Sequence, residues 1–412
     1  MEKDFHYKCN DCGRIYAITA DLMLCPYCSE EYLSGKPLRG ILKVILPKYL
    51  SGSKRPGEDF DLFDYLPVEK QYFPGIPVGN TPLVRACRLE EELNYENIYL
   101  KFDGMNPTGS YKDRASYLVS AFARKNCIKE IVVASTGNAA SSMAGIAASA
   151  DQKVFVFMPS SAPRAKLIQC LQYGACLIPV KGNYDEAFDL SLGFSRLTGY
   201  LNRNTAFNPL TIEGKKTAAF EIAGQLRNKN VDYVFLPVGD GVILDGIIKG
   251  FCDLKQIGLI TKIPRIIGVQ AEKSAYIYRA FKENLFDTEY VAETIADSIS
   301  VNVARNAYSA VKSLREADGD IVVVSDEEIL LSQKLVAEKS GLFCEPSSAA
   351  AFAGFAKVRD TLPENKNVVV LLTGNGLKDI ETAAKNVQFP EIFQPDLEFI
   401  MKRLRVLGEI EG

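Results

Sequence analysis

The sequence of 412 residues contains a single histidine and no tryptophan, and the scarcity of histidine restricts the chemistry open to the protein. Histidine is the usual general base, triad member and metal ligand near neutral pH. His6 lies in a polar stretch near the first residue, so histidine-based catalysis and histidine-ligated metal centres are disfavoured. Lysine, carboxylates, hydroxyl groups and a bound cofactor remain as means of catalysis.

The chain also lacks an excess of one charge and any long apolar run. Its formal net charge is -3, with both signs spread along the chain, whereas nucleic-acid binding is marked by a basic domain or stripe. A membrane span needs roughly 18 consecutive apolar residues, and the first residues lack the apolar core of a signal peptide. We therefore expect a cytoplasmic protein that binds small molecules and neither nucleic acid nor membranes.

Four of the ten cysteines form two Cys-x2-Cys pairs, and the other six occur singly. Two such pairs, Cys9 with Cys12 and Cys25 with Cys28, are typical of a structural Zn²⁺ ion held by four thiolates. A site with four cysteine ligands has no open coordination position, so this zinc would not be catalytic. Reduced turn cysteines or a redox pair remain the alternatives.

The chain divides into four segments by composition. Residues 1–35 form the predicted zinc ribbon, and residues 36–78 mix proline, glycine and charged residues as an N-terminal arm. Residues 79–390 alternate short apolar runs with helical periodicity, and residues 391–412 form a C-terminal helix or tail. The alternation predicts an α/β fold, with two parallel or mixed sheets covered by helices. We expect strands at 98–102, 131–134, 154–157, 233–236, 266–269 and 368–372, and helices at 139–150, 164–173, 215–226 and 326–340.

Lys112 lies in the segment Asn106-Pro-Thr-Gly-Ser-Tyr-Lys-Asp-Arg114, a glycine-containing turn that opens a helix. A lysine held in this way can form a Schiff base with an aldehyde cofactor such as pyridoxal phosphate. The alternative is an ordinary helix start, with Ser110 as N-cap and Lys112, Asp113 and Arg114 as a solvated first turn.

Three predicted strands run into turns that suit such a cofactor, because ligands of α/β folds bind beyond the carboxyl ends of strands. Ser135-Thr-Gly-Asn138 opens a helix and can hold a carboxylate through free N–H groups and hydroxyls. The glycine-rich segment 237–246 can bind a phosphate through backbone N–H groups. Thr373, after the strand at 368–372, offers a hydroxyl to a ring nitrogen. Each turn alone is also compatible with an ordinary cap or glycine turn.

Together and in this order, the segments resemble the threonine synthase family of fold-type-II pyridoxal-phosphate enzymes. The resemblance covers about residues 77–379. Beyond the turns described above, it includes Gly79-Asn-Thr-Pro-Leu-Val84, Asn208-Pro209, Glu213-Gly-Lys-Lys-Thr217 and Glu345-Pro-Ser-Ser348. It implies a fold like that of the tryptophan synthase β subunit, a homodimer, and a lyase in amino-acid biosynthesis.

The resemblance also implies a role for each matching residue. Lys112 would bind the cofactor and move the Cα proton of the substrate, and a neutral hydroxyl on the ring nitrogen would favour elimination and replacement over transamination. Asn138 would bind the ring hydroxyl, Thr373 the ring nitrogen, and Ser135 and Thr136 the substrate carboxylate. The cofactor phosphate would be bound by Gly239, Asp240, Gly241, Val242 and Ile243.

The sequence departs from the family at the substrate side of the pocket. Threonine synthases carry an arginine for the phosphate of O-phosphohomoserine at the position of Thr211, and an Asn-Ser pair at Thr205-Ala206. Thr211 replaces neither the charge nor the planar fork of a guanidinium. Arg305 is an alternative cation, although a surface salt bridge is its expected role. We expect Asp240 to turn away from the phosphate and cap the next helix.

The sequence therefore predicts a pyridoxal-phosphate-dependent carbon-oxygen lyase that eliminates phosphate or hydroxyl from an amino acid, with threonine synthase as the nearest activity and Thr211 at the substrate. The departures leave a β-elimination or β-replacement enzyme open, similar to serine or threonine dehydratases or cysteate synthase. A different alternative is a non-catalytic zinc-ribbon regulatory protein on a degenerate enzyme scaffold.

Overall fold

The computed structural model describes residues 3–33, 35–161, 164–227, 229–286 and 291–410. Its larger sheet has six strands in the order β12-β11-β10-β13-β5-β4. Neighbouring strands are parallel except β4, which pairs antiparallel with β5, so the sheet is mixed. The strands are β4 Leu83–Arg85, β5 Ile98–Phe102, β10 Tyr233–Pro237, β11 Arg265–Ala271, β12 Asp320–Val324 and β13 Val368–Leu372.

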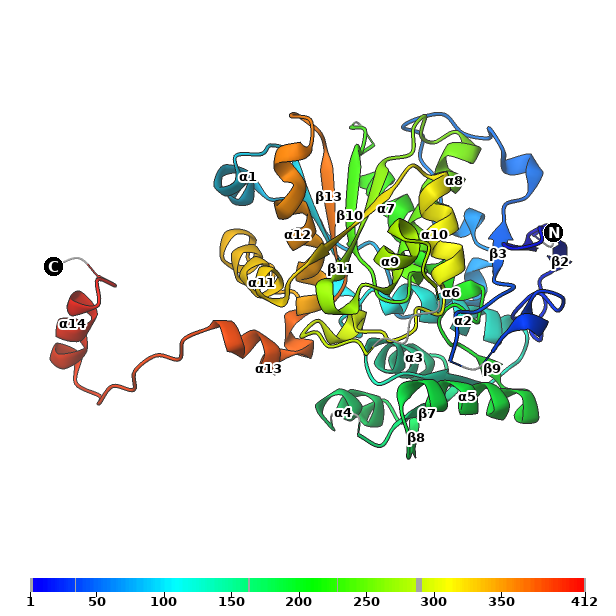
Figure 1. Cartoon of the computed structure of the whole chain (residues 1–412), viewed down its shortest axis with the longest axis horizontal. Coiled ribbons are helices and arrows are strands. Elements are labelled where there is room, and N and C mark those ends of the chain that lie inside the picture. The colour runs from blue at the N-terminus through cyan, green and yellow to red at the C-terminus, as the bar shows by residue number, and fades with distance from the viewer. Residues whose placement is uncertain (1–2, 34, 162–163, 228, 287–290, 411–412) are drawn as a thin grey trace.

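Helices cover both faces of this sheet (Figure 1). In β13, Val368 and Val370 pack on the side of α12, whereas Val369 and Leu371 pack on the side of α8. Every residue of this strand is buried, which explains its uninterrupted apolar sequence. The first face carries α1 Cys87–Leu93, α11 Asp326–Ser340 and α12 Pro346–Val358; the second carries α6 Leu210–Lys215, α7 Thr217–Gln225, α8 Val242–Ile257, α9 Tyr276–Lys282 and α10 Ala307–Glu316.

The smaller sheet has four parallel strands in the order β8-β7-β6-β9 and lies below the larger one in Figure 1. Helices α3 and α5 pack against its two central strands, and α2 and α4 pack on α3. The strands are β6 Glu130–Ala134, β7 Lys153–Pro159, β8 Cys176–Val180 and β9 Leu201–Asn202; the helices are α2 Lys112–Lys125, α3 Asn138–Ala148, α4 Arg164–Gln172 and α5 Tyr184–Thr198.

The predicted α/β fold is confirmed, and all six expected strands form. The sequence did not predict β4, β8, β9 and β12, which all lie at sheet edges. Of these, β8 has no buried residue and β12 has only two, so neither forms one buried run. The expected helix at 215–226 corresponds to α7, and the structure adds the unpredicted α6 before it, separated from α7 at Lys216.

The N-terminal cysteine segment forms a small antiparallel sheet with the order β2-β1-β3. Its third strand comes from the arm beyond residue 35, so the ribbon and the arm share one sheet. Lys43 of β3 binds the fully buried Asp245 of α8 at 2.6 Å, and this ion pair fixes the sheet to the larger body. The strands are β1 His6–Cys9, β2 Ile15–Ala17 and β3 Leu42–Ile45.

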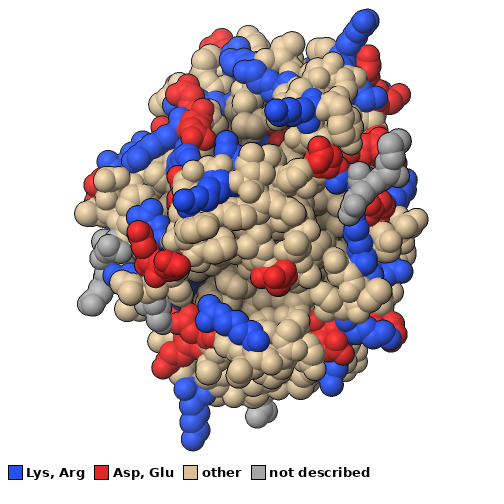
Figure 2. Space-filling view, turned by 90° about the vertical axis from the view of Figure 1, so that its right-hand side faces the viewer, with Lys and Arg blue, Asp and Glu red and all other residues tan. Residues whose placement is uncertain are grey.

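The chain ends in α13 Ile380–Ala383 and α14 Leu397–Val406, and α14 lies apart from the body (Figure 1). None of its residues is buried. In the described residues, no helix combines the length and apolar character needed to cross a membrane. Acidic and basic side chains intermix across the face shown in Figure 2 and do not separate into one acidic and one basic region.

Candidate active site

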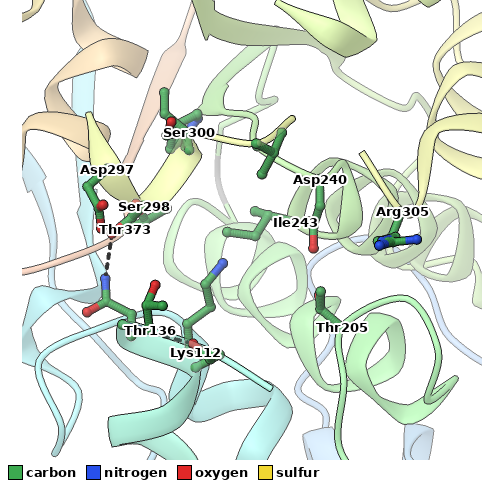
Figure 3. Close-up of a pocket in the computed structure, with 18 of the residues that line it drawn as sticks. Lys112, Thr136, Thr205, Asp240, Ile243, Asp297, Ser298, Ser300, Arg305 and Thr373 are labelled. Carbon is green, nitrogen blue, oxygen red and sulfur yellow. Dashed lines mark hydrogen bonds between the residues drawn. The ribbon is translucent and has the colours of Figure 1, made fainter. Parts of the chain in front are cut away.

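Lys112 is the first residue of α2, and its side chain projects into a cavity of about 330 Å³ (Figure 3). The backbone N–H of Tyr111 donates to the carbonyl of Thr373 at 2.7 Å, so the lysine turn is bonded to the end of β13. Burial lowers the pKa of Lys112, while the carboxylate of Asp240 opposes that effect. A lysine with a lowered pKa is a better nucleophile at neutral pH.

The alternative of an ordinary, solvated helix start at this position is wrong. Tyr111, not Ser110, occupies the N-cap position, and the Ser110 hydroxyl caps nothing. Asp113 is fully buried and accepts hydrogen bonds from the backbone N–H of Thr108 at 2.8 Å and from its hydroxyl at 2.5 Å. The turn is therefore held by buried polar contacts on both sides of Lys112.

Arg114 is the second support of the turn and is 2% exposed. Its guanidinium binds Asp103 at 2.5 Å and Glu221 at 2.6 Å. Lys101 of β5 also binds Glu221, at 2.7 Å. Two carboxylates thus compensate two buried cations, which is the condition for keeping such charges inside a protein.

The first turn of the site joins β6 to α3. Ser135, Thr136, Gly137 and Asn138 all line the cavity. The Asn138 amide donates to Glu345 at 2.9 Å and to the Ser298 hydroxyl at 3.1 Å. The start of α3 also lies at the cavity, so its free N–H groups and the two hydroxyls are placed to receive an anion.

The second turn joins β10 to α8. Gly239, Asp240, Gly241 and Ile243 line the cavity, whereas Val242 does not. The Val242 N–H donates to the Asp240 carboxylate at 3.1 Å. Gly241 has φ +89°, and a Cβ there would lie 2.7 Å from the Cβ of Ala310, so this turn needs glycine.

Asp240 corrects one expectation. It does cap the turn before α8, but its side chain faces the cavity opposite Thr205 and does not turn away (Figure 3). Burial alone would raise its pKa, yet the charges of Lys215 and Lys112 offset this and lower the pKa below its usual value. An ionised carboxylate therefore stands in the cavity wall.

The third turn follows β13 and brings Thr373 to the cavity. The Thr373 hydroxyl lies 3.1 Å from the Ser348 hydroxyl, at the start of α12. Ser348 also bonds the Gly374 N–H at 2.7 Å and so fixes the turn. The structure thus brings Lys112, Asn138 and Thr373, from three separate segments, to one cavity.

Two expectations on the substrate side are not met. The Thr211 hydroxyl donates to the Asn208 carbonyl at 2.8 Å, and Thr211 is absent from the described residues that line the cavity. Arg305 is 1% exposed and lies at the cavity, so it does not form a surface salt bridge. It pairs with Asp185 and donates to the Tyr32 hydroxyl at 2.9 Å.

Glu345 and Arg203 are two of the cavity residues that the sequence did not single out as site residues. Glu345 was noted only as part of a matching segment, although its carboxylate orients Asn138. Arg203 is wholly buried and lines the cavity. In the sequence, only its place two residues before Thr205, where the chain departs from the family, pointed to it.

The residues present fit pyridoxal phosphate. The cavity volume lies within the range of roughly 300–1,000 Å³ that is usual for small-molecule sites. It offers the Lys112 amine for the aldehyde, the Thr373 hydroxyl for the ring nitrogen, and the N-terminus of α8 for the phosphate. The model of the family described as "Pyridoxal-phosphate dependent enzyme" matches residues 76–374, which include all three turns.

The chain belongs to this family of pyridoxal-phosphate-dependent enzymes. It is similar to the threonine synthase of Methanocaldococcus jannaschii, with 33% identity over 97% of this chain and 99% of the relative. It is also similar to the threonine synthase of a Synechocystis strain, with 36% identity over 82% of this chain and 88% of the relative. The protein is therefore a threonine synthase-like pyridoxal-phosphate-dependent lyase.

Two solved structures share the fold of this chain. The processed threonine deaminase isoform 2 of Solanum lycopersicum matches with a TM-score of 0.66 and 27% identity, over 83% of this chain and 98% of that one. The maize serine racemase matches with a TM-score of 0.63 and 20% identity, over 80% of this chain and 93% of the racemase. The fold is that of fold-type-II pyridoxal-phosphate enzymes, as the sequence predicted, and the alternative of a non-catalytic scaffold is set aside by the family match.

The four paired cysteines lie together at the tip of the N-terminal sheet. Their sulfur atoms all lie within 4.8 Å of one another. The Cys9 and Cys28 sulfurs are 3.9 Å apart, and those of Cys12 and Cys25 are 3.7 Å apart. Four thiolates at about 2.3 Å from a tetrahedral Zn²⁺ would be roughly 3.8 Å apart, so the group has the dimensions of a zinc site.

Proposed function

We propose that this lyase acts on an amino acid that carries a leaving group on its side chain, with threonine synthase as the nearest activity. The observation that carries the proposal is the convergence of Lys112, Asn138 and Thr373 on one cavity. The cofactor, when bound, stabilises the negative charge that develops at Cα. The chain itself must then bind the substrate, exclude water and move protons.

Different residues of the cavity support proton transfer, substrate binding and the choice of reaction. In this proposal the Lys112 amine, which reaches the cavity, takes up the Cα proton. The Ser135 and Thr136 hydroxyls, with the N-terminus of α3, suit the substrate carboxylate. Thr373 presents a neutral hydroxyl to the ring nitrogen, and a neutral partner favours elimination and replacement over transamination.

One observation favours a second candidate, a β-elimination or β-replacement enzyme. At the position of Thr211, the threonine synthases that this chain resembles carry an arginine. Here the Thr211 hydroxyl donates to the Asn208 carbonyl, and Thr211 is absent from the described residues that line the cavity. The chain thus has no cation from that position for a phosphate.

Incubation with O-phosphohomoserine separates the two candidates. Threonine synthase activity predicts equal amounts of threonine and phosphate, measured together in one assay. Turnover at background level, combined with keto-acid or replacement products from serine, threonine or O-phosphoserine, would instead support the second candidate.

We also propose that the four-cysteine group binds one structural Zn²⁺ ion. The spacing of the sulfur atoms supports this, as does the shared sheet through which β3 reaches the catalytic body. Metal analysis of the purified protein tests it: zinc should be present in the wild type and lost from a Cys25→Ser variant.

A further inference from the structure

Arg203 follows the short strand β9 and is wholly buried at the wall of the cavity. Its Nε donates to the Ser116 hydroxyl at 3.2 Å. Its two terminal nitrogens, Nη1 and Nη2, have no hydrogen-bond partner among the described residues. A buried guanidinium without such partners is costly, so its retention at a cavity points to a ligand that supplies them.

Arg305 provides the contrast within the described part of the chain. It also lines the cavity, but its Nη atoms bind Asp185, the Tyr32 hydroxyl and the carbonyl of Lys36. These partners already compensate its charge. Arg203 is therefore the arginine whose planar fork remains available to a ligand.

The charges around Arg203 limit the ligand that it can bind. The buried Lys215 donates from Nζ to the Thr205 hydroxyl at 3.3 Å. The Asp240 side chain also points toward Thr205 (Figure 3). Burial lowers the pKa of Arg203 to about 10, and Asp240 opposes this shift, so the guanidinium stays charged at neutral pH. When Lys215 is protonated, Arg203 and Lys215 face the single carboxylate of Asp240, and one positive charge is left uncompensated. Burial lowers the pKa of Lys215, and an anion bound beside it favours its protonated form.

We propose that Arg203 binds a singly charged anionic group, best matched by a carboxylate, at the end of the side chain of the amino-acid substrate. The two terminal nitrogens of a guanidinium match the two oxygens of a carboxylate. A phosphate dianion would bring one more negative charge than the site leaves uncompensated. The inference rests on the proposed function, because it names the class of substrate for that same cavity. It favours the second candidate, a β-elimination or β-replacement enzyme, over an enzyme that acts on a phosphate ester.

The test measures binding to the purified holoenzyme, followed by the change in the visible absorbance of the cofactor. L-Glutamate and L-aspartate are compared with L-glutamine and L-asparagine, which have the same shape without the charge. Each acidic amino acid should bind about tenfold or more tightly than its amide. O-Phospho-L-serine should bind more weakly than L-aspartate.

Variants assign the preference to one residue. Arg203→Met should remove the preference for the acids and leave the affinity for L-glutamine nearly unchanged. Arg203→Lys, which retains the charge and disturbs folding less, should keep part of the preference. Arg196→Met, which removes an exposed arginine of α5, is the matched control and should behave like the wild type.

Three results would overturn the inference. The first is equal binding of acids and amides by the wild type, and the second is O-phosphoserine binding as tightly as L-aspartate. The third is an Arg203→Met protein with weakened affinity for pyridoxal phosphate but not for pyridoxal, which would assign Arg203 to the cofactor phosphate. A wild type without the visible band would contradict the proposed function instead, and calorimetric titration with the same amino acids would still decide the role of Arg203.

Discussion

Arg114 and Glu221 form a two-point ion pair, with Nη1 to Oε1 at 2.6 Å and Nη2 to Oε2 at 2.8 Å. The same Glu221 accepts from the backbone N–H of Asn80 at 2.8 Å and from Lys101. Helices α2 and α7 and the segment before β4 are thereby fixed to one another. Because Arg114 lies two residues after Lys112, this network fixes the start of α2, which carries the lysine.

Breaking the network should destabilise the fold. Arg114→Met leaves Asp103 and Glu221 buried without their main partner, so we expect the free energy of unfolding to fall by about 3–5 kcal/mol. Urea denaturation measures the change. Lys129→Met, which removes an exposed partner of Asp151, is the control and should change stability little. Equal effects of the two variants would contradict the structural role of Arg114.

Glu221 should make the stability depend on acid pH. Burial would raise its pKa, but Arg114 and Lys101 outweigh burial and lower the pKa to about 2. Because the folded pKa is below the unfolded one, the stabilisation is complete above about pH 4.5 and is lost as the pH falls toward 2. Denaturation curves at several pH values should show this loss for the wild type and a smaller one for Glu221→Gln.

Lys112→Ala should remove covalent attachment of the cofactor and the lyase activity together. The cavity loses its amine, whereas the supporting contacts of Asp113 and Arg114 remain, so the fold should persist. The visible absorbance band of the wild type should vanish while the circular dichroism spectrum stays the same. Lys129→Ala, at an exposed site, should retain both band and activity. A band that survived in Lys112→Ala would show that another lysine holds the cofactor.

If the four-cysteine group binds zinc as proposed, removal of the metal should weaken the contacts of the cavity wall as well as the ribbon. Tyr32 lies just after the cysteine pairs and binds both Arg305 and Asp189 of α5, the latter at 3.1 Å. We therefore expect chelation to lower the melting temperature and to raise KM more than it lowers kcat. Cys252→Ser, which changes a cysteine outside the group, should leave both quantities unchanged. An unaltered KM after complete loss of zinc would contradict this link.

The sequence alone was sufficient to predict the fold class and the lysine turn that lines the cavity. The apolar runs are uninterrupted where a strand is buried on both faces, as in β13, because every residue of the strand then packs against a helix. Edge strands such as β8 bury less and left no clear pattern. The glycine and hydroxyl turns were recognisable because a cofactor site at the ends of parallel strands needs those residue types.

The tertiary structure decided the electrostatics of the site. Ordinary polar residues in the sequence, such as Asp113 and Arg114, are buried supports of Lys112, and their burial is set by segments far along the chain. Arg305 likewise binds Tyr32 and the carbonyl of Lys36, which lie far from it in the sequence. The terminal nitrogens of Arg203 have no hydrogen-bond partner among the described residues. The sequence by itself thus determined which cofactor chemistry the protein performs. Only the fold decided which charges meet in the cavity, because burial and pairing depend on residues that are neighbours in space and not in sequence.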